Sequence, residues 1–141
     1  MVKDKTEREF WRTELKDGLK ALGHCCRIES HATSIGLPDV NLKMKVNQND
    51  WWIEVKVSDL PGAYVEVRPA QWMWHTRRRI VGGRAMFITR WHRPYGLVYT
   101  VNTQGPLNED RFDRWCADAD LVMHDRIDWE RLIGVLKNAQ V

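Results

Sequence analysis

The chain has 141 residues, of which 43% are hydrophobic and 29% charged, and its formal net charge is +3. These values are ordinary for a folded soluble protein and predict one domain over residues 1–141. No apolar run is long enough to span a bilayer, and the charged N-terminus lacks the apolar segment of a signal peptide. Three cysteines without metal-ligand spacing indicate reduced thiols, so we expect an intracellular, cytoplasmic protein without a membrane partner.

Hydrophobic spacing predicts the secondary structure. Apolar residues recur at helical spacing after Thr6, a candidate N-cap, and stop at Gly23, which predicts a helix over Thr6–Leu22. The further predicted elements are strands at His24–Glu29, Asp39–Met44 and Trp51–Val57, a helix at Pro69–Val81, strands at Arg84–Arg90 and Gly96–Val101, a helix at Asn108–Ala117, a strand at Leu121–His124 and a helix at Trp129–Asn138. Asn47–Asp50 is predicted to be a hairpin turn, and Asp128 to cap the last helix. This order is typical of an α/β fold with a mixed sheet flanked by helices.

The most informative motif is Pro38-Asp39 followed by Glu54-Val-Lys56. Along the predicted strand, period two places Glu54 and Lys56 on one face. A hairpin can bring Asp39, on the polar face of the preceding strand, beside Glu54. Two adjacent carboxylates repel unless a cation lies between them, so the pattern favours Mg²⁺, or Mn²⁺ in its place.

The E-x-K spelling alone is weak evidence, because Glu14-Leu-Lys16 has it too. That copy lies in a predicted helix, where residues two apart do not share a face. The alternative for Glu54 and Lys56 is an exposed ion pair on a strand, which contributes little to stability.

Residues 27–56 resemble the core of the PD-(D/E)xK nucleases, and specifically the VRR-NUC family in its small phage and bacterial forms. Two further segments agree with that family: Glu7-Arg-Glu-Phe-Trp11, and Arg68-Pro-Ala-Gln71-Trp72 with the Gly82-Gly83 and Ala85-Met-Phe-Ile88 that follow. The resemblance covers roughly residues 6–90, with weaker agreement at Ile127–Arg131. It implies a restriction-endonuclease-like αβββαβ core. It also implies a protein of a bacterial or phage-infected cell.

The resemblance also implies roles for individual residues. Asp39 and Glu54 would bind Mg²⁺ together with an acid of the first helix, Lys56 would orient or activate the attacking water, and Gln71 would border the site. The family register favours Glu7 as the helix acid. Glu14, which lies near the same edge of the apolar stripe, and Glu29 in the following segment stay open as alternatives.

Basic residues are concentrated in one segment. From Arg68 to Arg93 there are seven arginines and no acid, which favours a phosphate-binding surface. The candidate DNA-binding residues are Arg68, Arg77, Arg78, Arg79 and Arg84. Trp72 and Trp74 lie in this segment, where packing is the first expectation and stacking on unpaired bases the second. No base-reading motif is present, so DNA shape is the expected recognition signal.

The sequence therefore predicts a metal-dependent endonuclease for branched DNA such as four-way junctions. By resemblance it acts as a homodimer, whose two-fold symmetry suits two symmetric cuts. The alternatives are a less selective nicking or restriction-like nuclease, and a non-catalytic DNA-binding module of the same fold.

Overall fold

A six-stranded sheet forms the centre of the protein, with the strands in the order β1-β2-β3-β4-β5-β6. The computed structural model describes residues 2–28, 36–58, 64–104 and 111–138. The strands are β1 (Gly23–Arg27), β2 (Val40–Met44), β3 (Asp50–Ser58), β4 (Arg84–Arg93), β5 (Gly96–Asn102) and β6 (Leu121–His124). The helices are α1 (Val2–Phe10), the π-helical turn η1 (Trp11–Leu15), α2 (Lys16–Leu22), α3 (Pro69–Ile80), α4 (Phe112–Ala117) and α5 (Trp129–Asn138).

The sheet is mixed, as predicted. Neighbouring strands are antiparallel except β3 and β4, which are parallel. A parallel pair requires a crossover connection, and α3 lies within the segment that links these two strands. None of the described helices is long and apolar enough to cross a membrane.

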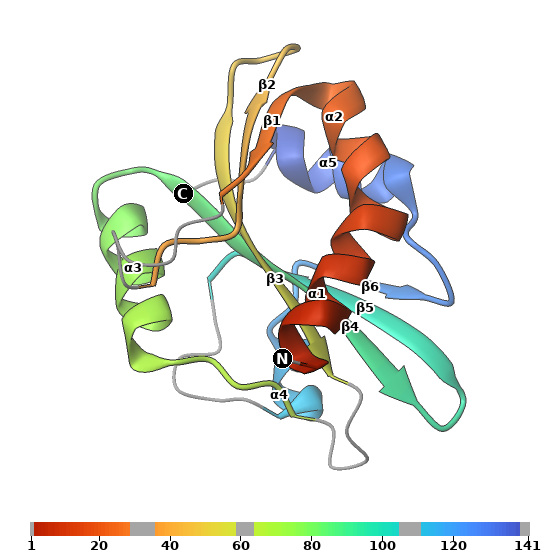
Figure 1. Cartoon of the computed structure of the whole chain (residues 1–141). Helices are drawn as coiled ribbons and strands as arrows, with labels where there is room; N and C mark the ends of the chain where they lie inside the picture. Colours follow the sequence, from red (N-terminus) through yellow and green to blue (C-terminus); the bar gives the residue numbers. More distant parts are fainter. Residues whose placement is uncertain (1, 29–35, 59–63, 105–110, 139–141) are drawn as a thin grey trace.

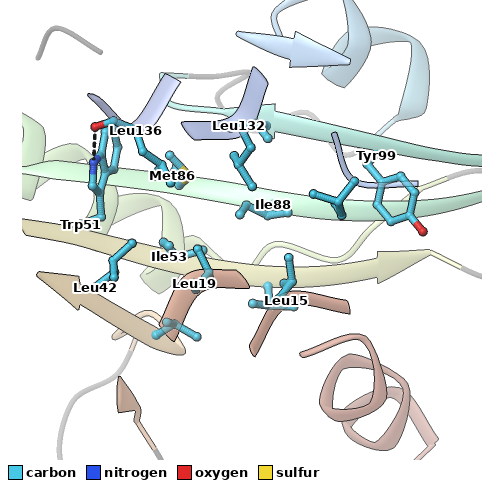
Figure 2. Packing of buried hydrophobic residues seen from close by; sticks show 14 of the residues in the cluster. Leu15, Leu19, Leu42, Trp51, Ile53, Met86, Ile88, Tyr99, Leu132 and Leu136 are labelled. Atoms are coloured by element: carbon cyan, nitrogen blue, oxygen red, sulfur yellow. Dashed lines mark hydrogen bonds between the residues drawn. The ribbon is translucent and has the colours of Figure 1, made fainter. Parts of the chain in front are cut away.

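Alternating residues of β4 supply the two faces of the sheet. Met86 and Ile88 belong to a large core cluster shared with the N-terminal helices and α5, whereas Phe87 and Trp91 belong to a second cluster shared with α3 and α4. Figure 1 shows α3 on one side of the sheet and α1, α2 and α5 on the other. Figure 2 shows part of the large cluster, in which Leu15 and Leu19 of the N-terminal helical segment and Leu132 and Leu136 of α5 pack on the same face of the sheet.

The N-terminal helical segment differs from its prediction in two respects. It begins at Val2 rather than Thr6, because the charged residues before Thr6 include lysines, which are good helix formers and continue the helix. It also contains the π-helical turn η1, after which α2 continues to Leu22. The predicted apolar stripe is largely confirmed: Trp11, Leu15 and Leu19 are buried.

Gly23 ends the helical segment, as predicted, but in an extended conformation rather than a left-handed one. It is the first residue of β1, and a Cβ there would lie 1.9 Å from the carbonyl oxygen of Lys43 on β2. The predicted end of this strand, Glu29, lies outside the described residues, as does the predicted helix start at Asn108. The described helix α4 begins at Phe112.

Three strands are longer than predicted. β3 runs from Asp50 to Ser58, β4 continues past Arg90 to Arg93, and β5 ends at Asn102 rather than Val101. The β4 extension follows from its hairpin with β5, in which backbone pairing continues to Arg93 opposite Gly96. Asp39 lies just before β2, which begins at Val40.

The β2–β3 hairpin is joined to the end of α5. Asn47 donates to the Lys137 carbonyl at 3.3 Å, while Asn49 and the Trp51 indole donate to the Leu136 carbonyl at 3.1 and 2.9 Å. The indole bond is drawn in Figure 2. These donors satisfy carbonyls that a helix end leaves without intrahelical partners. At the other end of α5, Asp128 accepts from the Arg131 amide at 3.3 Å, which confirms the predicted cap.

Two helical glycines predict opposite effects on stability. A Cβ at Gly18 would lie 2.2 Å from the Trp129 ring, whereas one at Gly134 would meet nothing within 4 Å. We expect Gly18→Ala to lower the free energy of unfolding by about 1–3 kcal/mol through overpacking. Gly134→Ala should raise it by about 0.5–1 kcal/mol through helix propensity. Urea denaturation followed by circular dichroism measures both, and a stabilising Gly18→Ala would contradict the packing of α2 against α5.

Candidate active site

The hairpin register places Asp39 opposite Glu54. Val40 pairs with Ile53, so the next position of the antiparallel ladder sets Asp39 against Glu54. Side chains directly opposite each other have Cβ atoms about 4.5–5.5 Å apart. The Val55 amide donates to Asp39 Oδ2 at 3.0 Å, which holds this carboxylate against β3 where the backbone pairing with β2 ends. The predicted meeting of the two acids therefore occurs.

Glu54 is buried, with 2% of its surface exposed. Its Oε2 accepts from Gln71 Nε2 at 3.2 Å and lies 3.9 Å from Lys56 Nζ. Its other oxygen, Oε1, is buried and accepts no hydrogen bond from a donor of the described residues. The neighbouring Asp39 carboxyl can hydrogen-bond it only when one of the two groups is protonated.

Lys56 is held by α3 and the segment before it. Its ammonium, on a residue only 4% exposed, donates to Gln71 Oε1 at 3.1 Å and to the Glu66 carbonyl at 2.8 Å. Gln71 Oε1 also accepts from the Arg68 amide at 2.9 Å, in the manner of a capping residue at the third position of a helix. With its oxygen occupied by these donors, the amide presents its NH₂ group to Glu54, so Gln71 connects the two site side chains.

The protonation of Glu54 depends on its surroundings. Burial raises the pKa of this carboxyl well above its ordinary value of 4.5, and the negative charge of Asp39 raises it further. Lys56 lowers the pKa, and Glu7 makes a smaller contribution that raises it. A cation beside Glu54 would favour its charged form and so oppose the effects of burial and of Asp39 on its pKa.

Glu7 is the acid that the family register favours on the first helix. Its negative charge makes the smallest of these contributions to the raised pKa of Glu54, and its place in the site stays a prediction. Glu29, the third candidate, lies outside the described residues.

Glu14 is engaged elsewhere. One of its oxygens accepts from Arg90 Nη1 at 2.5 Å, and the other accepts a short hydrogen bond from the Tyr99 hydroxyl. Glu9 lies 3.9 Å from the same arginine. Glu14 therefore pairs with a buried arginine of β4, and the second E-x-K sequence has a structural role.

Asp39 and Glu54 are the two carboxylates of this site that could hold a metal ion. No group of three or more His, Cys, Asp or Glu side chains within the described ranges could hold a metal ion. Mg²⁺ is nonetheless commonly bound by one or two carboxylates, with water and substrate phosphate completing its shell. Asp39 and the unsatisfied Oε1 of Glu54 fit this pattern, because a buried like-charge pair is stabilised by a cation between its members.

The five predicted DNA-binding arginines have different surroundings. Arg68 and Arg77 are exposed, and Arg84 is half-buried. Arg78 lies over the Trp74 ring with its guanidinium carbon 4.6 Å from the ring centroid. Arg79 donates to the Thr103 carbonyl at 2.9 Å, and burial lowers its pKa from the ordinary value. Arg68 and Arg77 are thus the most accessible to phosphate.

His75 lies one turn after Gln71 and is fully buried, stacked on Phe87 with ring centroids 4.1 Å apart. Burial, with smaller contributions from Arg79 and Lys56, lowers its pKa to about 3. It is therefore neutral at physiological pH and is a packing residue rather than a general acid. Sequence reasoning also missed Glu66, because it acts through its backbone carbonyl and its side-chain type carries no signal.

The raised pKa of Glu54 predicts a pH-dependent stability. Between pH 4.5 and the raised value, the folded state keeps a proton that the unfolded state has released, so the free energy of unfolding falls as pH rises. We expect Glu54→Gln, measured in chelator, to be more stable than wild type at neutral pH and to lose this slope. Urea denaturation at a series of pH values measures the pH dependence of the free energy of unfolding, with the exposed Glu130→Gln as control. Parallel pH profiles of wild type and Glu54→Gln would contradict the prediction.

Comparison of the chain with family models, curated proteins and solved structures finds no match. Membership of the VRR-NUC family therefore stays a prediction that depends on the motif residues themselves.

Proposed function

We propose that this protein is a divalent-metal-dependent endonuclease that hydrolyses phosphodiester bonds in DNA. One observation carries the proposal: buried Glu54 lies beside Asp39 on one side and the Gln71–Lys56 pair on the other. Two neighbouring carboxylates repel each other, and the Lys56 ammonium beside them is held by two acceptors. This arrangement suits a site that binds a cation and a phosphate together. A surface ion pair would not require such burial.

The chemistry proposed for each residue combines the family resemblance with the contacts of its side chain. Mg²⁺ held by Asp39 and Glu54 would polarise a phosphoryl oxygen and increase the acidity of a water. Lys56 orients that water and stabilises the negative charge that develops on the phosphate, because its ammonium is already positioned by two acceptors. Gln71 positions both Glu54 and Lys56, and Glu7 adds negative charge on the side of α1.

DNA is the proposed substrate because the accessible arginines lie at the same helix as the site. Arg68 is the N-cap of α3, three residues before Gln71, and Arg77 is exposed further along the same helix. Arginine–phosphate contacts provide affinity without sequence information. The proposal also includes a preference for branched DNA and the formation of a homodimer, both of which follow from the family resemblance. Analytical ultracentrifugation can measure the oligomeric state.

Cleavage of a labelled four-way junction and of a matched linear duplex, each with Mg²⁺ and with chelator, tests the function. Cleavage of the junction alone supports structure-specific activity. Equal cutting of both substrates favours the less selective nuclease, and binding without cleavage under any divalent metal favours the non-catalytic module.

Lys56→Met should separate cleavage from binding. Methionine retains most of the buried stem and removes the ammonium, so we expect cleavage to fall by about 10²–10³-fold, the usual loss when a transition-state donor is removed. DNA affinity measured in chelator should change little. Lys16→Met, in the second E-x-K sequence, is the matched control and should cleave like wild type. A fully active Lys56→Met would refute the role of Lys56.

Metal binding can be tested without DNA. If Asp39 and Glu54 bind Mg²⁺ in the folded state only, free Mg²⁺ at 100 times the dissociation constant should raise the free energy of unfolding by about 2.7 kcal/mol. Thermal or urea denaturation with and without Mg²⁺ measures this gain. Asp39→Asn should abolish it and the exposed Asp17→Asn should keep it; an equal gain in both variants would place the ion elsewhere.

A further inference from the structure

The outer side of α3 borders a hollow of about 710 Å³, here called the α3 groove. Its volume is within the range of small-molecule sites. Its lining residues are Ala70, Met73, Trp74, Arg77, Arg78 and Val81. They combine apolar and aromatic surface with two guanidinium groups and include no acid, so the groove favours a ligand that is flat, apolar on its faces and attached to negative charge.

The aromatic wall of the groove, Trp74, packs against neighbouring side chains. The Trp74 and Trp52 rings have centroids 5.4 Å apart, and the Arg78 guanidinium carbon lies 4.6 and 5.4 Å from them. Both indoles are half-buried, whereas Trp72 is buried and packs on Phe87 with centroids 5.1 Å apart. The two tryptophans of the basic segment therefore differ: Trp72 belongs to the core, and Trp74 lines the groove.

The groove lies next to the candidate active site. Trp52 precedes Glu54 by two residues on the same face of β3, a separation of about 7 Å. On α3, Trp74 follows Gln71 by three residues, which is a rise of about 4.5 Å along the axis. Gln71 contacts Glu54, and the groove residue Trp74 contacts Trp52, so the same two elements, α3 and β3, meet both at the site and beside the groove.

We propose that the α3 groove binds an unpaired nucleobase of a DNA strand whose neighbouring phosphate is at Asp39, Glu54 and Lys56. A base within a duplex already has its faces stacked, whereas an unpaired base offers a free face to Trp74. The exposed Arg77 and the half-buried Arg78 match the charge of the adjoining phosphates, which distinguishes this occupant from an apolar protein segment. The proposal rests on the proposed nuclease function and adds that the substrate has an unpaired nucleotide beside the cut.

The test compares two strands of equal charge. Fluorescence anisotropy in chelator, where no cleavage occurs, measures the affinity of wild type for a labelled oligothymidine and for an abasic strand of equal length. We expect oligothymidine to bind about 10-fold tighter, within the roughly 5- to 150-fold range that base–aromatic stacking supplies. Equal affinities would overturn the proposal, because they would show a phosphate contact only.

Two pairs of variants locate the effect. Trp74→Ala should abolish the preference for oligothymidine, whereas Tyr95→Ala, at an exposed aromatic outside the groove, should keep it. Trp74→Ala also removes the contact of Trp74 with Trp52, so a second variant, Met73→Glu, changes a groove residue that is 50% exposed. Its control is Val46→Glu, at a residue that is 64% exposed on the β2–β3 hairpin. We expect Met73→Glu to weaken oligothymidine binding about 10-fold and so to abolish its preference over the abasic strand, and Val46→Glu to have little effect on either affinity.

The outcomes separate the groove from the nuclease. Loss of the base preference in both groove variants, with both controls unchanged, supports the groove even if no substrate is cleaved. Retention of the preference in Trp74→Ala and Met73→Glu overturns it, even if wild type cleaves junctions with Mg²⁺.

Discussion

The antiparallel register of the β2–β3 hairpin is the constraint on which the site depends. A shift by one residue would turn Glu54 and Lys56 to the opposite face, because side chains alternate along a strand. The register is specified by burial of Leu42 and Ile53 on the core face and by the hairpin's hydrogen bonds to the end of α5. Packing on one face of the sheet therefore positions the polar residues on the other.

This arrangement has an electrostatic cost at Glu54. The carboxyl is buried beside Asp39, and both burial and that neighbour oppose its ionisation. Gln71 offsets part of the cost through a contact that exists only because α3 lies over this face of β3, and Lys56, two residues along the same strand, offsets part of it through its charge. A structure optimised for stability alone would have an apolar residue at this position, so the retained carboxylate is the strongest indication of a functional site.

The N-terminal helical segment contributes both to the site and to the core. Glu7 acts on Glu54, while Glu14, two turns later, pairs with the buried Arg90 and Tyr99. The π-helical turn that contains Glu14 changes the angular relation between the residues before and after it. The prediction assumed an ideal helix of 3.6 residues per turn, which does not include this change. It therefore placed Glu7 and Glu14 near the same edge of the apolar stripe.

The sequence by itself determined the strands, the hairpin turn and the faces of β3, because period two and turn chemistry are local properties. It also identified Asp39, Glu54, Lys56 and Gln71, whose meeting follows from one hairpin and one crossover. Only the tertiary structure paired Glu14 with Arg90, directed the Arg79 guanidinium to backbone carbonyls, and separated buried Trp72 from Trp74. These outcomes depend on how helices are rotated and where loops pass, and residue spacing carries no information about either.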